Sequence, residues 1–129
     1  MFRPLLVPFI ALAAWIGCAY VFGDPTRTST PSFGAAQDLA PMQLWGAMFL
    51  AGAAVLTLSM FLNERLMHAA LFVGGVIYAW WGALFALSAA HDPEASLVSP
   101  ALYGFLAAIH FLAGSPDLTD LLRRKVNVR

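Results

Sequence analysis

The stretch LMHAALFVGGVIYAWWGALFALSAA, residues 66–90, contains no aspartate, glutamate, lysine or arginine. A helix rises 1.5 Å per residue, so about 20 apolar residues cross the ~30 Å hydrocarbon core of a bilayer. The stretch is longer than that requirement, and uncharged runs of this length are typical of transmembrane segments. We therefore predict a membrane-spanning helix over residues 66–90.

Three further apolar runs lie on either side of this one. They cover residues 5–23, 42–62 and 97–114. Lipid offers no hydrogen-bond partners to the backbone, so a chain that spans it repeatedly does so as helices. We predict an all-α fold, an integral membrane four-helix bundle that forms a single domain over residues 1–129. Residues 24–40 are rich in Thr, Ser, Pro and Gly and show no apolar periodicity, and we expect them to form a polar outer loop.

The overall composition agrees with a membrane location. Hydrophobic residues make up 60% of the chain and charged residues 11%, whereas soluble domains average about 45–50% and about 25%. The formal net charge is zero, which gives no reason to expect a nucleic-acid partner. The partner that the composition predicts is the lipid bilayer.

The basic residues are distributed unevenly among the segments that connect the runs. Arg27 alone falls in the first connection, and the third connection has no Lys or Arg. The other six fall in the N-terminal end, the second connection and the tail: Arg3, Arg65, Arg123, Arg124, Lys125 and Arg129. Because cytoplasmic segments carry the excess of Lys and Arg, we predict a multi-pass protein of the cell inner (cytoplasmic) membrane with both termini cytoplasmic.

The first run also has some features of a secretion signal. It follows a short basic start, and Trp15-Ile16-Gly17-Cys18 partly matches a lipoprotein cleavage box. That box usually requires a Leu-like residue where Trp15 stands, and the run stays apolar through Val21 and Phe22. A retained helix is therefore favoured over a cleaved or lipidated N-terminus. Cys18 is the single cysteine, so the sequence excludes an internal disulfide.

Few residues in the runs could carry chemistry. The four runs contain no Asp, Glu, Lys or Arg, which counts against a proton-coupled transporter because intramembrane charges usually mark such pathways. His110 is either a pH-sensitive group or a neutral imidazole bonded across helices to Ser59, Thr57 or a carbonyl, and the second interpretation is favoured. The segment 91–94 favours a solvated turn over a metal site. We expect neither enzymatic activity nor a cofactor.

Small residues recur at four-residue spacing in the runs. The candidate positions for helix packing or self-association are Gly46, Gly52, Gly74, Gly75, Ala79, Gly82, Gly104 and Ala108. Helices in lipid have no hydrophobic reason to associate, so small residues that allow close approach are their main packing device. These positions either pack one bundle or mediate self-association. If residues 66–90 form an oligomer face, replacing Gly74 and Gly75 by leucine should disrupt it.

The tail, residues 115–129, predicts a short basic helix beside the membrane. Ser115-Pro116-Asp117 is typical of a helix start. From there, Leu118, Leu121 and Leu122 share one face, opposite Asp120, Arg123 and Arg124. The basic residues Arg123, Arg124, Lys125 and Arg129 are then expected near anionic headgroups. The tail serves either as a topology anchor or as a regulatory or partner-binding segment.

Four local features carry a family resemblance. They are Pro41-Met42-Gln43-Leu44-Trp45-Gly46, the Asn63-Glu64-Arg65 turn, Tyr78-Ala79-Trp80-Trp81, and the short basic tail. In these features and in layout the chain resembles the small four-span membrane proteins of actinobacterial bacteriophages, some of which are labelled holins. The resemblance implies a holin-like protein that self-associates in the bacterial inner membrane, permeabilises it and times lysis, so that an endolysin reaches the cell wall.

Two other functions remain open at the level of sequence. The same small-residue faces fit a non-enzymatic accessory or scaffold subunit that binds a larger membrane partner. A small channel or uniporter is a third reading, and the lack of intramembrane charge counts against it. The first alternative predicts a hetero-complex, whereas the holin-like function predicts a homo-oligomer.

Overall fold

The computed structural model of the protein describes residue 4 and residues 6–127, without the side chains of residues 118, 119 and 122. All regular structure in this part of the chain is helical, which confirms the all-α prediction. The elements are α1 (Leu6–Phe22), α2 (Pro25–Thr28), the 3₁₀ helix η2 (Pro31–Phe33), α3 (Gly34–Leu39), α4 (Met42–Phe61), α5 (Glu64–His91), α6 (Val98–Gly114) and α7 (Pro116–Asn127).

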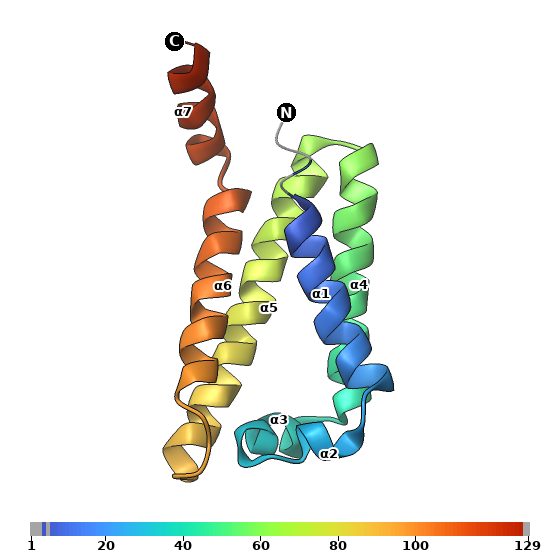
Figure 1. Ribbon diagram of the computed structural model, residues 1–129. Helices are drawn as coiled ribbons and strands as arrows, with labels where there is room; N and C mark the ends of the chain where they lie inside the picture. Colours follow the sequence, from blue (N-terminus) through green and yellow to red (C-terminus); the bar gives the residue numbers. More distant parts are fainter. Residues whose placement is uncertain (1–3, 5, 128–129) are drawn as a thin grey trace.

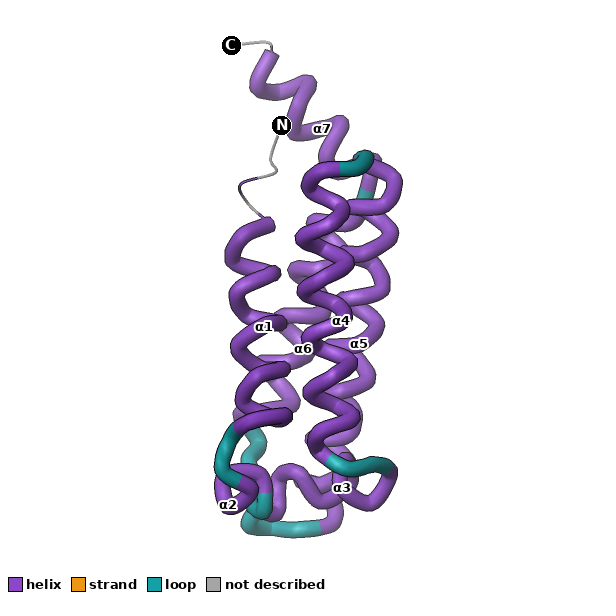
Figure 2. Tube along the Cα trace, turned by 90° about the vertical axis from the view of Figure 1, so that its right-hand side faces the viewer, coloured by secondary structure: helices purple, strands orange, loops and turns teal. Residues whose placement is uncertain are grey.

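Four long helices lie side by side and alternate in direction (Figure 1). The pair α1 and α4 and the pair α5 and α6 make the most extensive contacts. The start of α1, the α4–α5 turn and α7 lie at one end of the molecule, and α2 and α3 lie at the other end with the α5–α6 turn (Figure 2). This is the grouping of connections that the basic residues predict. Arg3 and Arg129 themselves lie outside the described residues.

Two of the four helices are long and apolar enough by themselves to cross a membrane. They are α4 with 20 residues and α5 with 28 residues, whereas α1 and α6 are apolar helices of 17 residues each. Helix α5 begins at Glu64, before the predicted residue 66, because the Asn63 side chain caps it and accepts a hydrogen bond from the Leu66 N–H at 2.8 Å. The polar turn thus contributes its last residues to the first turn of the helix.

The first connection, residues 24–40, was predicted as a loop and is instead three short helical segments. Asp24 caps α2 by accepting a hydrogen bond from the Thr26 N–H at 3.0 Å, and this bond holds the pKa of the Asp24 carboxyl below its usual range. Pro25 and Pro31 stand at first helical positions, where a missing N–H costs nothing. Segments of three to six residues are too short to show a 3.6-residue period, so apolar periodicity could not reveal them.

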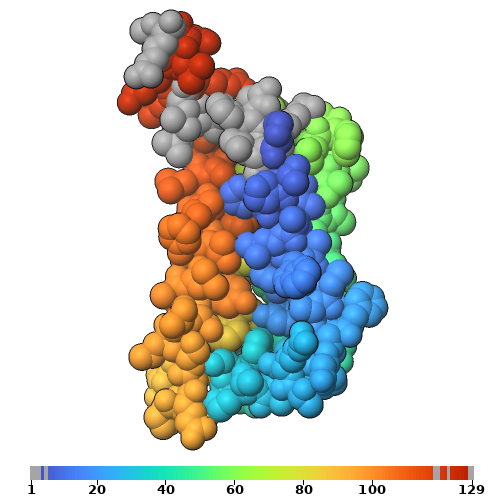
Figure 3. Space-filling model, viewed as in Figure 1, coloured from blue at the N-terminus to red at the C-terminus, as the bar shows by residue number. Residues whose placement is uncertain are grey.

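The first connection is tied to the ends of the long helices. The Ala35 N–H donates to Ser88 Oγ of α5 at 3.0 Å, and Trp45 Nε1 of α4 donates to the Ala36 carbonyl at 3.0 Å. On the face formed by α1 and α6, this connection closes one end of the molecule (Figure 3). Tertiary hydrogen bonds therefore fix the conformation of a segment whose own sequence shows little preference for regular secondary structure.

Helices α1 and α4 approach closely where two glycines meet. A Cβ atom placed on Gly46 would lie 2.8 Å from the Gly17 carbonyl oxygen, and one placed on Gly17 would lie 2.9 Å from the Gly46 carbonyl oxygen. Side chains at this crossing are therefore excluded both by the partner backbone and by the side chains of Leu50 and Val21, which lie 2.6 and 2.7 Å from the two Cβ positions. Close backbone approach of this kind is how helices gain packing contacts in lipid.

Helices α5 and α6 pack along most of their shared length. Near the α4–α5 turn, a Cβ atom on Gly114 would lie 3.1 Å from Leu71 Cβ and 3.1 Å from the Phe72 nitrogen. Near the opposite end, a Cβ atom on Gly82 would lie 3.3 Å from Tyr103 Cβ and 3.4 Å from the Gly104 nitrogen. These glycines set the distance between the two helices.

Candidate functional site

An aromatic cluster joins the two helix pairs. Trp81 of α5 is 0% exposed and stands at its centre. Its ring centroid lies 5.5 Å from that of Tyr20 on α1, 5.2 Å from that of Trp45 on α4 and 6.5 Å from that of Tyr103 on α6. Rings at these separations and tilted orientations attract one another beyond their simple contact area. The cluster therefore holds all four long helices to one centre.

The tyrosines that look scattered in the sequence meet in this cluster. Tyr20 Oη lies 3.3 Å from Tyr103 Oη, a hydrogen bond between α1 and α6. Tyr78 stacks on Tyr103 with ring centroids 6.2 Å apart. Tyr20 and Tyr103 therefore form a hydrogen bond between helices, whereas Tyr78 contributes its ring and not its hydroxyl. The sequence could not predict this cluster, because its three tyrosines lie on three separate helices and follow no periodic pattern along the chain.

His110 lies in the interior, between α1, α5 and α6. It is 1% exposed, and its ring centroid lies 4.6 Å from that of Phe9 and 4.7 Å from that of Tyr78. Its Nδ1 lies 2.7 Å from the Leu106 carbonyl oxygen, one turn earlier on the same helix. A bond across helices to Ser59, Thr57 or a carbonyl was expected, and the carbonyl that His110 meets belongs to its own helix. Those two hydroxyls donate to the Leu56 and Ala53 carbonyls of their own helix.

Among the described residues, two buried polar atoms near the cluster make no hydrogen bond of good geometry: Tyr78 Oη and Trp81 Nε1. Buried polar groups are paired in the great majority of cases, so each unpaired one calls for an explanation. Tyr78 is 2% exposed and lies against His110. An unpaired hydroxyl beside an imidazole is the most polar feature that the interior contains among the described residues.

A lateral pocket of about 380 Å³ leads from the surface between α4 and α5 to Tyr78 and His110. Its walls are apolar, and its residues come from all four long helices: Ala13, Met48, Ala51, Gly52, Val55, Leu56, Leu66, Ala69, Ala70, Val73, Gly74, Ile77, Tyr78 and His110. Gly52 lies at its open side, since a Cβ atom there would meet nothing within 4 Å. The pocket is a hydrophobic recess, and the buried residues Tyr78 and His110 form part of its wall.

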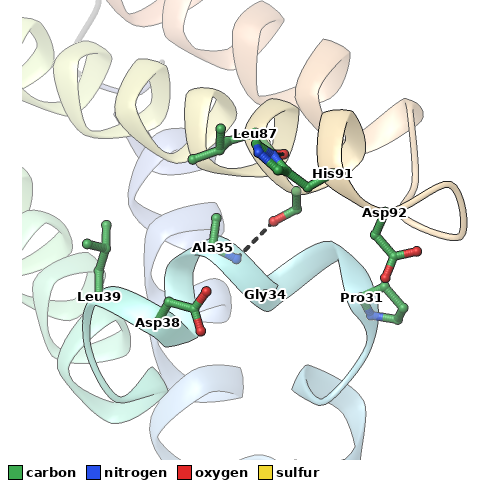
Figure 4. Close-up of a pocket in the computed structure, with 9 residues that line it drawn as sticks. Pro31, Gly34, Ala35, Asp38, Leu39, Leu87, His91 and Asp92 are labelled. Atoms are coloured by element: carbon green, nitrogen blue, oxygen red, sulfur yellow. Dashed lines mark hydrogen bonds between the residues drawn. The ribbon is translucent and has the colours of Figure 1, made fainter.

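A second groove of about 480 Å³ lies at the C-terminal end of α5, against η2 and α3. Figure 4 shows Asp38 and Asp92 toward opposite ends of it, with His91 on α5. His91 Nδ1 lies 2.9 Å from the Leu87 carbonyl oxygen, and Asp92 Oδ1 accepts a hydrogen bond from the Glu94 N–H in a turn. Within the described part of the chain, no three His, Cys, Asp or Glu side chains are grouped as a metal site requires.

The predicted small-residue positions divide into two sets. Gly46, Gly74, Gly75 and Gly82 face a neighbouring helix: the nearest contacts of their Cβ positions come from Val21, His110, Phe111 and Tyr103, respectively. Gly52 and Gly104 meet nothing within 4 Å, and Ala79 and Ala108 are exposed. The leucine substitutions at Gly74 and Gly75 would therefore act first on the contact between α5 and α6.

Seven exposed small residues lie on one face of the α5–α6 pair. They are Ala79, Ala83, Ala86 and Ala90 on α5, and Ala101, Gly104 and Ala108 on α6. Spacings of three and four residues keep each set on one side of its helix. Gly82 contacts the Gly104 backbone, which brings the two sets together, and the core residue Trp81 points the other way, toward α1 and α4. We call this surface the alanine face.

The tail begins as expected, with α7 starting at Pro116 and Asp117 in its first turn. Arg123 Nη2 lies 2.9 Å from Glu64 Oε1, and this ion pair joins α7 to the first turn of α5. Arg124 and Lys125 are exposed. The side chains of Leu118 and Leu122 and all of Arg129 lie outside the description, so the predicted apolar face of the tail stays a prediction.

Comparison with known proteins finds no family model, no curated protein and no solved structure that matches the chain. A function must therefore be inferred from the chain's own surfaces. These are an apolar exterior, the alanine face, an apolar lateral pocket and a basic tail.

Proposed function

We propose that this chain is a non-enzymatic membrane protein that crosses the bacterial inner membrane four times, self-associates in its plane and permeabilises it in a holin-like manner. Helices of 17 residues rise about 25 Å, which places α1 and α6 at the lower limit for spanning. Their outward side chains include Trp15, Leu102 and Phe105, all exposed. Such residues favour contact with lipid over contact with water.

The charge pattern supports the proposed orientation. Arg65, at the start of α5, and Arg124 and Lys125 of α7 lie at the end of the molecule that holds the α4–α5 turn, whereas Asp24, Asp92 and Glu94 lie at the other end with a single basic residue, Arg27. The excess of basic residues marks the cytoplasmic side. The exposed Arg124 and Lys125 of α7 can then contact anionic headgroups, each contributing about 1 kcal/mol.

The observation that carries the self-association proposal is the alanine face. It is smooth, uncharged and not covered by any other helix of the described chain. In lipid, a surface of small residues allows a second backbone to approach closely. The glycines that could have served the same purpose, Gly46, Gly74, Gly75 and Gly82, are already engaged within the chain.

Expression of the chain in bacteria tests the lytic part of the proposal. We expect normal growth, then an abrupt loss of membrane potential and viability once the protein passes a threshold, with lysis only when an endolysin is co-expressed. Optical density, a potential-sensitive dye and colony counts report the three events. Prolonged growth with an intact potential at high expression would contradict the holin-like function, and purification with a stoichiometric partner would favour the accessory-subunit alternative.

Replacing Gly104 by leucine tests the alanine face. The Cβ position of Gly104 is open, so the substitution should leave the fold unchanged while a bulky side chain keeps a second copy away. We expect self-association in lipid vesicles to weaken about tenfold, equivalent to ~1.4 kcal/mol. Energy transfer between donor- and acceptor-labelled copies, measured against the protein-to-lipid ratio, gives this quantity. Gly52→Leu is the control and should leave energy transfer unchanged. Gly52 also has an empty Cβ position, but it lies on α4, away from the alanine face.

A further inference from the structure

Helix α7 is joined to α6 through a single non-helical residue, Ser115. The next residue, Pro116, has no backbone N–H, so the hydrogen-bond pattern of α6 is interrupted at this point. Just before it, the Gly114 carbonyl accepts a hydrogen bond from His68 Nδ1 of α5 at 3.1 Å. The end of α6 is therefore fixed to α5, and Ser115 is the point about which α7 can change direction.

One ion pair restrains α7 beyond this joint. The helix extends past the end of the four-helix bundle (Figures 1 and 2), and Arg123 Nη2 lies 2.9 Å from Glu64 Oε1 in the first turn of α5. The two side chains are 41% and 47% exposed, and ion pairs this exposed contribute little to stability. A guanidinium forms the same charge-assisted hydrogen bonds with a phosphate as with a carboxylate. A phosphate group can therefore replace Glu64 as the partner of Arg123.

The side of α7 that faces away from this ion pair is apolar and basic. Leu121 is 59% exposed, and Arg124 and Lys125 lie three and four residues further along, on the same side of the helix. Arg123 follows Leu121 by two residues and so lies on the opposite side. The acidic residues of α7 are in its first half: Asp117 and Asp120. An apolar side chain beside two cations matches an anionic membrane surface.

We propose that α7 is a latch that opens on an anionic phospholipid surface. In the proposed orientation α7 projects from the cytoplasmic side, so Leu121 stays in water while Arg123 is paired with Glu64. Turning the helix about Ser115 brings its apolar and basic side onto the headgroups and separates the ion pair. Several basic residues add their attraction to an anionic leaflet, and one exposed ion pair opposes them. Anionic lipid therefore opens the latch, and neutral lipid leaves it closed.

The inference rests on the membrane location and orientation that are part of the proposed function. It does not depend on self-association or lysis, because α7 and the alanine face involve different residues.

Fluorescence from the end of α7 tests the latch. The full-length protein carries Cys18→Ser and Val126→Cys, with a nitrobenzoxadiazole label on the new thiol, in phosphatidylcholine vesicles with increasing fractions of phosphatidylglycerol. We expect emission typical of water in phosphatidylcholine alone. As phosphatidylglycerol rises, the emission should shift to the blue and become sensitive to spin-labelled lipid. Identical spectra at every lipid composition would overturn the inference.

A matched pair of variants tests the role of the ion pair. Glu64→Gln removes the partner of Arg123, so the shift should occur at an about threefold lower fraction of phosphatidylglycerol, as expected for the loss of a weak exposed pair. Glu94→Gln removes the same charge at the other end of the molecule and should respond like the parent protein. If both variants respond alike, Glu64 does not hold α7 and the latch is refuted.

The double variant Arg124→Gln, Lys125→Gln tests the contact with lipid. It keeps the Arg123–Glu64 pair and removes two basic side chains from the free side, so α7 should stay closed at fractions of phosphatidylglycerol that open the parent protein. An unchanged response would contradict the proposal. Helical circular dichroism of each variant separates a change in the latch from loss of the fold.

The outcomes for the latch and for the proposed function can be told apart. If α7 responds to phosphatidylglycerol but the protein neither self-associates nor lyses cells, the proposed holin-like function fails and the latch stands. If the protein lyses cells while the label on α7 ignores lipid charge, the latch fails alone.

Discussion

Gly46→Leu is expected to separate α1 from α4 and to destabilise the protein by about 3 kcal/mol or more. Overpacking a well-packed site typically costs about 1–3 kcal/mol, and here the obstacle is backbone. The Cβ position of Gly46 lies 2.8 Å from the Gly17 carbonyl oxygen, which no rotamer change can move. The two helices must therefore shift apart over their whole crossing.

The measurement is unfolding of the protein in mixed micelles, titrated with sodium dodecyl sulfate and followed by circular dichroism. Gly52→Leu is the matched control, because it places the same side chain on the same helix in open space. We expect a marked fall in the unfolding midpoint for Gly46→Leu and almost none for Gly52→Leu. Equal midpoints for the two variants would show that α1 and α4 do not cross at these glycines.

Trp81→Ala is expected to be the most damaging truncation in the interior, at about 3–5 kcal/mol. Trp81 is 0% exposed and contacts aromatic rings on each of the other three long helices. In lipid, the hydrophobic part of this loss is smaller, and the lost dispersion contacts and the cavity remain. Because these rings bridge the two helix pairs, we expect α1–α4 and α5–α6 to lose their relative position.

Trp80→Ala, one residue away, is the control for this prediction. Trp80 is 54% exposed and faces outward, so its removal should change the unfolding midpoint little. Disulfide trapping between cysteines introduced on α1 and α6 reports the relative position of the two pairs, with Cys18 replaced by serine to remove the native thiol. Equal sensitivity of Trp80 and Trp81 to truncation would mean that the aromatic cluster does not hold the pairs together.

Local sequence predicted the long helices closely, and it did so for a simple reason. Uncharged runs bounded by Asn63-Glu64 and by His91-Asp92 can satisfy their backbone only as helices, so α5 follows from composition and length. The start of α7 at Pro116 follows from the same kind of local signal. The first connection could not be predicted, because its short helices are held by a hydrogen bond from the Ala35 N–H to Ser88 on α5 and by one from Trp45 at the start of α4 to the Ala36 carbonyl.

The functional residues divide in the same way. Sequence spacing identified Gly46, Gly74, Gly52 and Gly104 as small residues with a role in packing, but it gave each the same weight. The structure distinguishes them, because the position of a neighbouring backbone or ring decides whether the space beside each glycine is occupied or empty. Gly17 was overlooked, although Ala13 precedes it at the same four-residue spacing.

What the sequence by itself determined is the set of long helices and the grouping of their connections by charge, because length, polarity and basic residues act locally along the chain. What only the tertiary structure decided is which surfaces are inside and which are free. Trp81 and Trp80 are adjacent and chemically identical, yet one joins four helices and the other faces outward. That difference arises from the rotation of α5 against its neighbours, which depends on side-chain contacts between residues far apart in the sequence.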